Sequence, residues 1–373
     1  MRKVTSSTPL RLVAALCLTA ALAFGASTTG LTTGKAPLKS AGPLAFGPDG
    51  VLFVGDSAGA AIVAIDTRDN KAARSAAPID VKGINEKVAA LLGTSKDQIL
   101  INDIKVNPIS KNVYLSVSRG KGPDATPVVL RLDASGKMSE LSLDSVDYAA
   151  ASIPNPPAAK PGTQSKVTYA TNANPRLDTV TQIAYVNGSV VVAGLSNEEF
   201  SSNLRTIPFP FKSDVQSSNI EIYHGSHGRY ETQAPVRTFV PYTIKNKQYI
   251  VAAYTCTPLV VIPMSDLKGG TKVKGNTIAE LGAHNRPIDM IAYKKDNHDY
   301  ILMANSARGV MKVSADHLET YKPITTPSDI AGVPYQIVSG LTGVTRLTSL
   351  DDSKALILTE SNGAMYLRSV PLP

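Results

Sequence analysis

The chain has 373 residues, of which 43% are hydrophobic and 18% charged, and its formal net charge is +8. A chain of this length can bury one large core. Its basic residues are scattered among acidic ones and are not interleaved with tyrosines as a base-stacking surface requires, so we do not expect nucleic acid as a partner. The composition does not indicate an oligomeric state.

Residues 1–26 have the pattern of a secretory signal peptide. Arg2, Lys3 and Arg11 precede an apolar run from Leu12 to Phe24, and small residues follow it. The run is shorter than the 18 to 20 residues of a spanning helix, and no later stretch is longer, so we expect no transmembrane anchoring. We therefore expect a secreted or periplasmic protein. Removing residues 1–26 would also remove Cys17 and leave Cys256 as the one cysteine, which excludes an internal disulfide.

After an N-terminal segment of residues 27–43, one pattern is repeated six times. Each unit has a short apolar strand, a polar turn, a second apolar strand that ends in small polar residues, and a third apolar strand. The units begin near these residues: Leu44, Ile101, Leu177, Val236, Pro287 and Val344. Strand repeats of about 40 to 50 residues are typical of β-propellers. The sequence predicts an all-β, six-bladed propeller in a single domain, residues 44–373.

Two insertions interrupt the units, at residues 70–97 and 140–175. The first contains INEKVAALLG, whose apolar spacing and terminal Gly93 predict a short helix near residues 82–93. The second is rich in Ala, Pro, Ser and Asn without a period, which predicts a long loop; strands hidden in it would make a seventh blade. We expect a strand from residues 30–45 to pair with the last unit and close the ring.

The repeat predicts which residues share a face. In a propeller blade the innermost strand begins at one face, and the turn between the second and third strands returns to it. We call this face the top. The turns between first and second strands, such as Asn187-Gly188, are hairpin turns on the bottom face. Polar second turns, such as those at Cys256 and Arg308, then surround the top mouth.

Ionisable and potentially metal-ligating side chains are most concentrated in one segment, His224-Gly-Ser-His227-Gly-Arg229-Tyr-Glu231. Two imidazoles three residues apart on a Gly-rich loop can turn toward one ion, and Glu231 can be a third ligand or orient a ring. His284 leads into the next unit, and Cys256 lies in the top turn between them. Such a set predicts a site for copper, zinc or iron in preference to calcium. Alternatively, these histidines only bond to backbone groups and Cys256 is a buried small hydrophobe.

Arginines also gather on the predicted top face. Arg286 and Arg308 fall on top loops, together with Arg119, and Arg229 lies close by. Guanidinium groups at a mouth favour an anionic ligand through paired hydrogen bonds to carboxylate or phosphate. The alternative is a solvated rim in which they pair with acids. We assign Glu231, Cys256, Arg286 and Arg308 as candidate catalytic residues and His224, His227 and His284 as candidate metal ligands.

A second candidate set lies nearer the axis. It comprises Asp103, Asp178, Asp289 and Glu360, with amides from Asn102, Asn305 and Asn362. Carboxylates and amides that converge from several blades make an oxygen cage, which calcium prefers. An acid at the start of an inner strand can instead be a cap on the loop before it.

In blade pattern, residues 44–373 resemble the six-bladed gluconolactonase, paraoxonase and strictosidine-synthase-like propellers and the NHL-repeat proteins. The resemblance is one of architecture. In the lactonases, a Glu, Asn and Asp set around the axis holds a metal that polarises an ester carbonyl. The resemblance implies that the nearest matches are Asp103, Asp178, Asp289 and Glu360.

Three functions remain open, because one propeller fold hosts many activities. The first is a transition-metal enzyme, a hydrolase or an oxidoreductase, that acts on a small anionic molecule through the histidines and Cys256. The second is a lactonase-like hydrolase with a hard cation on the axial acids. The third is a non-catalytic scaffold that binds a protein or a glycan. Motifs for a P-loop, an H-E-x-x-H helix and C-x-x-C-H haem attachment are absent.

Overall fold

The computed structural model describes residues 30–159, 174–256 and 258–373, together with Met1. The predicted signal peptide, and residues 160–173 of the second insertion, lie outside these ranges. In the described part, strands dominate and the one α-helix is α1 (Ile84–Leu91), as the first insertion predicts. No helix among these residues is long and apolar enough to cross a membrane.

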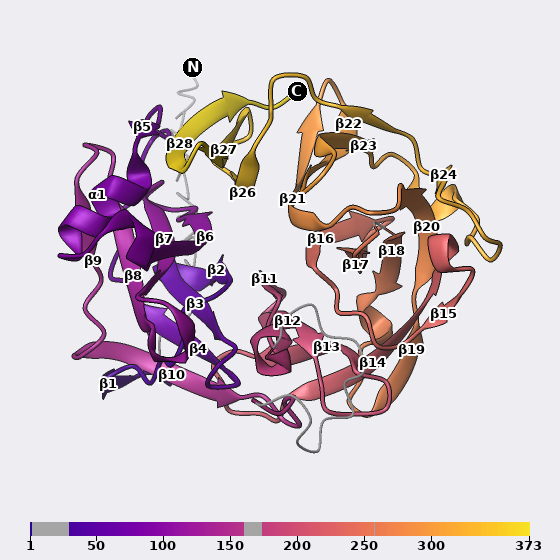
Figure 1. The fold of residues 1–373 in the computed structure, drawn as a ribbon, viewed down its shortest axis with the longest axis horizontal. Coiled ribbons are helices and arrows are strands. Elements are labelled where there is room, and N and C mark those ends of the chain that lie inside the picture. The colour runs from indigo at the N-terminus through magenta and orange to yellow at the C-terminus, as the bar shows by residue number, and fades with distance from the viewer. Residues whose placement is uncertain (2–29, 160–173, 257) are drawn as a thin grey trace.

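Six sheets surround a central axis, so the prediction of a six-bladed β-propeller is confirmed (Figure 1). We number the blades by the sequence order of their units. The innermost strands, one for each predicted unit, are β2 (Leu44–Phe46), β6 (Ile99–Val106), β11 (Gln182–Val186), β16 (Thr238–Ile244), β21 (Pro287–Lys295) and β26 (Val344–Ser349). Among the described residues there is no seventh sheet.

The blades grow outward as antiparallel strands. The second strands are β3 (Val51–Asp56), β7 (Val113–Arg119), β12 (Ser189–Leu195), β17 (Lys247–Ala253), β22 (His298–Asn305) and β27 (Lys354–Ser361). The third are β4 (Ala61–Asp66), β8 (Thr126–Leu132), β13 (Ser202–Pro208), β18 (Pro258–Pro263), β23 (Gly309–Ser314) and β28 (Ala364–Pro371). The second strands are apolar along most of their length because blades pack against both of their faces, as in the fully buried β3.

The outer strands are less regular. The fourth strands, in blade order, are β10 (Val146–Ser152), β9 (Met138–Glu140), β14 (Gln216–His224), β20 (Asn276–Leu281), β25 (Tyr335–Ile337) and β5 (Asp80–Lys82). Beyond them lie β1 (Thr32–Gly34), β15 (Arg229–Glu231), β19 (Thr271–Lys274) and β24 (Ile330–Gly332). Short 3-10 helices are η1 (Pro48–Gly50), η2 (Lys96–Gln98), η3 (Gly122–Asp124), η4 (Pro175–Asp178), η5 (Gly225–His227), η6 (Met264–Asp266) and η7 (Leu318–Thr320).

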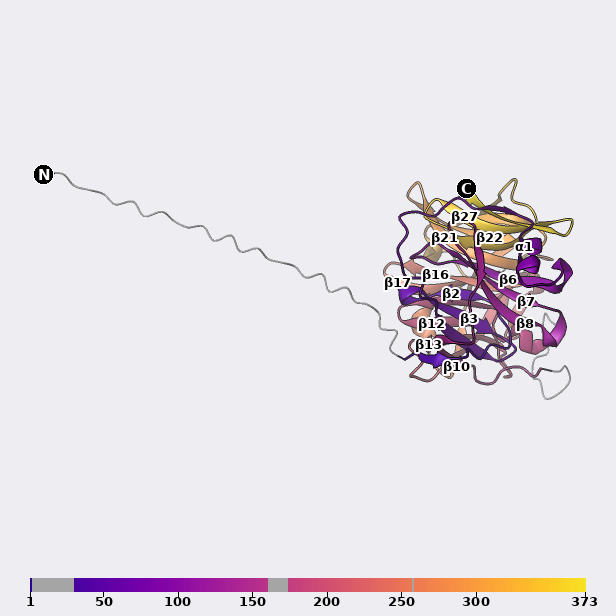
Figure 2. The same cartoon turned by 90° about the vertical axis from the view of Figure 1, so that its left-hand side faces the viewer.

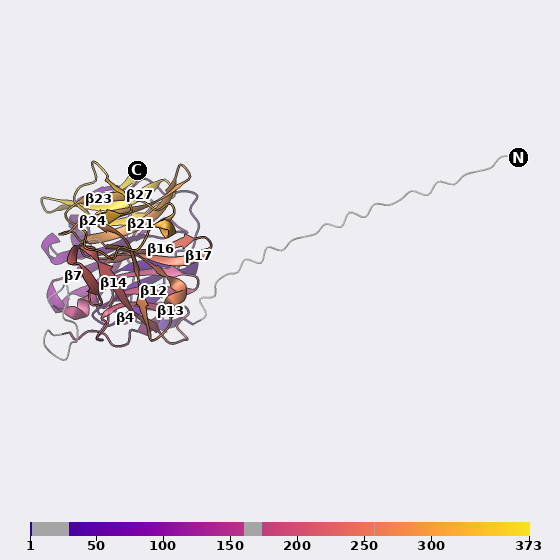
Figure 3. The same cartoon turned by 90° about the vertical axis from the view of Figure 1, so that its right-hand side faces the viewer.

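The core lies between neighbouring blades, not in one central mass. One cluster joins Ile84 and Val88 of α1 to blades 2 and 6, with Leu115 and Leu358 from their second strands. Figure 2 shows α1 beside β6 and β7. Another cluster joins blades 3 and 4, which lie on the side that faces the viewer in Figure 3. Each blade therefore depends on its neighbours for burial of its apolar faces.

The blades do not follow one another around the ring in sequence order. The inner strand of blade 1, β2, contacts β6 on one side and β11 on the other, and β26 contacts both β6 and β21. The order around the ring is therefore blades 2, 1, 3, 4, 5 and 6, and Figure 1 shows this arrangement. The chain passes from blade 2 to blade 3 by way of β10, which is the outer strand of blade 1.

Two predictions about the connections were wrong. Residues 30–45 do not close the last blade, because β1 pairs with β10; the strand that pairs with β28 is β5. Blade 6 borders blade 2, so the segment that leads into blade 2 reaches it directly. Residues 140–175 are also not a continuous loop, since they contain β10, whose sequence VDYAAAS has one β-branched residue and three alanines, a weak signal for a strand.

Candidate functional site

A tight turn at the outer edge of blade 3 places the predicted histidines together. Strand β14 ends at His224, η5 follows, and β15 folds back so that His224 lies opposite Arg229. Gly225 is required here, because a Cβ atom would lie 2.8 Å from the backbone oxygen of Ser328 and 2.8 Å from a carbon of Glu280. Gly228 has a positive φ of 65°, which completes the turn.

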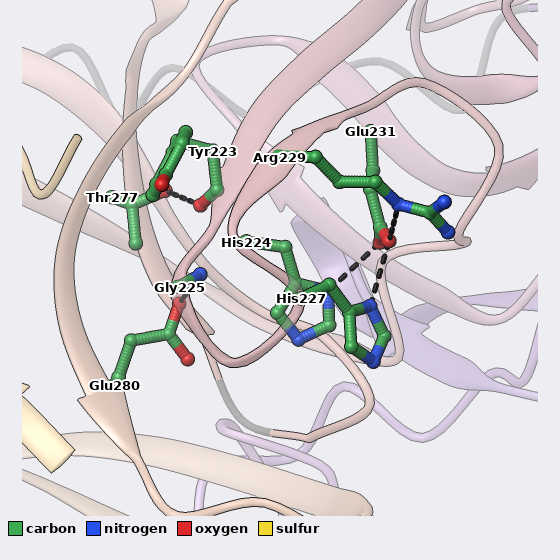
Figure 4. Close-up of polar contacts among 8 residues, drawn as sticks. All are labelled: Tyr223, His224, Gly225, His227, Arg229, Glu231, Thr277 and Glu280. Carbon is green, nitrogen blue, oxygen red and sulfur yellow. Dashed lines mark hydrogen bonds and ion pairs between the residues drawn. The ribbon is translucent and has the colours of Figure 1, made fainter. Parts of the chain in front are cut away.

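One carboxylate orients both imidazole rings. The Nδ1 atom of His224 lies 2.8 Å from one oxygen of Glu231, and the Nδ1 atom of His227 lies 2.7 Å from the other. The two rings are 3.9 Å apart between centroids, and Figure 4 shows both with Nδ1 toward Glu231. Since an ionised carboxylate only accepts, each Nδ1 donates its proton, and each Nε2 keeps a lone pair.

Glu231 is ionised at neutral pH. Burial opposes its charge, but hydrogen bonds from His224 and His227 and their electrostatic attraction outweigh burial, and the pKa of Glu231 falls to about 2. Arg229 adds a further contact at 3.2 Å. A carboxylate that fixes the tautomer and direction of a histidine is the usual support of a metal ligand.

Cys256 completes a cluster of three ligand atoms. The sulfur of Cys256, a ring nitrogen of His224 and one of His227 all lie within 4.8 Å of one another, which makes this the one group of three or more potential metal-ligating side chains among the described residues. The Nε2 atom of His224 is buried and has no hydrogen-bond partner in the described structure. Buried polar atoms normally have a partner, so a buried nitrogen with an unused lone pair is consistent with a metal-binding site.

The backbone of Cys256 is strained. Its φ of 62° lies in the left-handed region, which costs a non-glycine residue about 1–2 kcal/mol. A hydrogen bond of 2.7 Å from its backbone N–H to the Asn285 carbonyl oxygen holds the turn in place. Strain of this kind is retained where the surrounding structure requires it, often at functional positions.

Glu280 of β20 lies beneath the histidine turn. One of its oxygens accepts the backbone N–H of Gly225 at 2.5 Å. Burial, with the nearby charges of Asp329 and Glu231, raises the pKa of Glu280 to about 8 although the bond from Gly225 opposes the rise. Near neutral pH this side chain therefore carries a proton.

The other predicted residues of this site lie apart from the cluster. His284 is exposed on the loop before β21 and is not a member of the group. Arg308 is exposed on the neighbouring top turn and donates to the carbonyl oxygen of Ala283 at 3.2 Å. Arg119 is exposed at the end of β7. Arg286 instead faces a cavity on the axis.

This axial cavity, of about 540 Å³, opens where the inner strands begin. Of the predicted oxygen ligands, Asp103 and Asp289 line it, and both act as caps on a neighbouring blade. Asp103 accepts the backbone N–H groups of Leu44 and Ile104, and Asp289 accepts that of Leu347. Burial, together with the charge of Asp103, raises the pKa of Asp289.

The remaining two acids do not join them. Asp178 is buried in a 3.0 Å ion pair with Arg237. Glu360 lines a neighbouring cavity of about 600 Å³ between blades 5 and 6, together with Asn305 and Asn362. The four predicted acids therefore do not form one cluster among the described residues.

Two lining residues were missed by the sequence analysis, Arg237 and Arg346. Both occur near the start of a repeat unit, but Arg237 is the second residue of VRTF and Arg346 is the third of VTRL. The repeat therefore gives them no shared position by which the sequence could have identified them.

Comparisons with known proteins establish no family for this chain. No family model matches the chain, and no curated protein matches its sequence. Among solved structures, the extracellular domains 1–2 of Drosophila Semaphorin 1b match with a TM-score of 0.40 at 11% identity, over 91% of this chain and 88% of that one. The soluble aldose sugar dehydrogenase of Escherichia coli matches with a TM-score of 0.34 at 13% identity, over 92% and 99%. An engineered GH43 glycoside hydrolase matches with a TM-score of 0.37 at 14% identity, over 74% and 52%. Likenesses this weak carry no argument about activity.

Proposed function

We propose that this protein is an exported metalloenzyme whose centre is a transition metal bound by His224, His227 and Cys256. The observation that carries the proposal is the shared carboxylate of Glu231, which holds the Nδ1 atom of both rings, together with the cluster in which a ring nitrogen of each histidine and the sulfur of Cys256 lie within 4.8 Å of one another. Export rests on the pattern of residues 1–26.

The chemistry of the donors favours copper or zinc. Two imidazoles and a thiolate suit both ions, while calcium and magnesium require oxygen ligands that the cluster lacks. Glu231 does not serve as a fourth ligand, because both of its oxygens accept from the histidines. It is a positioning residue that fixes the tautomer and the direction of both rings.

Three protein ligands leave a coordination position open, and such sites are typically catalytic, whereas structural zinc sites are closed by four. The side chain of His227 is 35% exposed, so water and a small substrate can reach this position. A metal bound here would act as a Lewis acid or as a redox centre toward the substrate. The chain's own contribution is to hold the ligands, keep both rings in the metal-binding tautomer and leave one side accessible.

Elemental analysis of the protein, purified without chelator, tests the proposal. We expect close to one equivalent of copper, zinc or iron in the unmodified protein and loss of that metal in the His224→Ala, His227→Ala double variant. The matched control is His298→Ala, which removes an exposed histidine that pairs with Asp316, far from the cluster in the fold.

Circular dichroism must show that the double variant is folded. Metal retained by the folded double variant would overturn the proposal. Calcium bound equally by all three proteins would point to the axial acids, and no metal in any of them after supply of copper, zinc and iron would point to a binding scaffold.

A further inference from the structure

The axial cavity joins three arginines to an apolar wall. Its lining includes Arg237, Arg286 and Arg346, and apolar side chains from Pro43, Leu100, Pro287 and Ile288. Leu100 is 59% exposed, although it is a large hydrophobic residue. The cavity has a volume of about 540 Å³, which is in the range of pockets for small organic molecules.

Two of these arginines are held by the protein. Arg237 forms the buried ion pair with Asp178. Arg346 donates to the carbonyl oxygens of Asn102 and Thr345. Both guanidinium groups thus have fixed positions at the mouth, and their charge raises the local positive potential.

Arg286 is different. Its backbone is fixed from both directions, because its N–H donates to the Ser306 hydroxyl at 3.1 Å and its carbonyl oxygen accepts from the Ser306 N–H at 2.9 Å. Its guanidinium group, however, makes no hydrogen bond or ion pair with any residue that the structure describes. All three arginines line the same cavity, and Arg286 is exposed. Partial desolvation and the charges of Arg237 and Arg346 lower the pKa of Arg286, although the charge of Asp178 opposes this shift.

The acids of the cavity limit the charge of a ligand. Asp103 and Asp289 line it, so a dianion such as phosphate would be repelled more strongly than a group with one negative charge. A carboxylate has one charge and two oxygens, which match the planar fork of a single guanidinium group. The apolar side chains of Leu100 and Ile288 can cover a hydrocarbon body.

We propose that the axial cavity binds a small organic monocarboxylate, whose acid group pairs with Arg286 and whose apolar body lies against Leu100 and Ile288. This inference does not depend on the metal centre. It supplies a location for the anionic ligand that the sequence predicts. The loop that carries Arg286 also contacts the proposed metal site, since the carbonyl oxygen of Asn285 accepts the N–H of Cys256.

Calorimetric titration with defined probes tests this assignment. The probes are acetate, butanoate, hexanoate and octanoate, with hexanamide as the neutral counterpart of hexanoate and inorganic phosphate as a dianion. We expect affinity to rise with chain length from acetate to hexanoate, no binding of hexanamide, and weaker binding of phosphate than of hexanoate. Arg286→Gln should weaken hexanoate binding by about tenfold or more, because a charged hydrogen-bonded pair is lost.

The matched control is Arg308→Gln, which removes the same charge from an exposed arginine of the same face that does not line the cavity. It should change hexanoate binding by less than about twofold, as expected for an exposed charge. Equal weakening of hexanoate binding by both variants would mean that anions are attracted only by the overall positive potential of the top face. That result would overturn the proposal. Failure of every carboxylate to bind, or tighter binding of phosphate, would also overturn it.

The titrations are repeated in the His224→Ala, His227→Ala variant. Binding of hexanoate that persists there, with the same dependence on Arg286, supports a site independent of the metal. The failure of the metal centre and the failure of the carboxylate site can therefore be distinguished.

Discussion

At the residue scale, Glu231 is the group on which the proposed metal centre depends most. In a Glu231→Gln variant, one amide oxygen can still accept from one histidine, but the amide nitrogen faces the other Nδ1 and forces that ring into the other tautomer. We expect the affinity for zinc to fall by about 10–100-fold, as measured by competition with a chromogenic chelator.

Arg229→Gln is the matched control for Glu231→Gln. Arg229 contacts the same carboxylate, but its side chain is 71% exposed and it does not touch either histidine in the hydrogen bonds described. We expect a change of no more than about twofold, in keeping with an exposed pair. If Arg229→Gln and Glu231→Gln weakened zinc binding equally, the effect of Glu231 would be one of local charge and not of ring orientation.

Glu280 gives the protein a pH dependence that can be measured. Its pKa is raised from 4.5 to about 8, so between these values the folded protein holds a proton that the unfolded chain has released. Stability therefore falls as the pH rises across this window, by on the order of 1 kcal/mol per pH unit. In Glu280→Gln, which keeps an acceptor for Gly225, we expect this fall to disappear.

Denaturant unfolding of both proteins at pH 5, 6, 7 and 8 measures the effect. The unmodified protein should lose stability relative to Glu280→Gln at each step. Parallel pH profiles for the two proteins would show that Glu280 does not hold a proton near neutral pH in the folded state.

The grouping of the histidines with Glu231 could be predicted because its signals are local. His224, His227 and Glu231 lie within eight residues, and the glycines between them allow the turn that joins them. Cys256 could be added because the repeat places it in a top turn. Arg237 and Arg346 could not be identified in the same way, since a single arginine beside an apolar strand has no local pattern, and only the closed ring brings the two together with Arg286.

At the scale of elements, the innermost, second and third strands of every blade could be predicted, whereas the ring order could not. The hydrophobic pattern of β12 or β22 is set by burial on both faces, and that pattern can be read along the chain. The strand β5 has only three residues, with a mixed sequence, and its partner β28 lies almost 300 residues away. Its pairing is fixed by the position of blade 2 beside blade 6, which follows from packing between blades.

The path of the chain from blade 2 to blade 3, by way of blade 1, is also determined by packing between blades. Strand β10 completes blade 1 only after blade 2 has been formed in sequence, and β1 then adds to β10. Four blades thus contain an outer strand that comes from another blade's unit or from an insertion: blade 1 has β10, blade 3 has β19, blade 4 has β24 and blade 6 has β5. Local sequence determines which segments are strands, and the order of packing determines which blade receives the outer ones.

At the scale of the whole molecule, the proposed metal centre would link two blades. His224 and His227 belong to the edge of blade 3, and Cys256 belongs to blade 4. Because every blade buries its faces against its neighbours in a closed ring, a bond that joins two blades should stabilise the whole molecule, as long as the ring unfolds cooperatively.

Thermal unfolding with and without zinc tests this link. A ligand at a hundredfold excess over its Kd adds about 2.7 kcal/mol if it binds the folded state alone. With an unfolding entropy of about 2.1 cal/mol/K per residue, a chain of this length should gain about 4 °C in Tm. We expect the same shift by far-ultraviolet circular dichroism and by tyrosine fluorescence, and none in the His224→Ala, His227→Ala variant. A shift seen by one probe only would mean that the blades unfold separately, and an equal shift in the variant would mean that zinc stabilises the protein at another site.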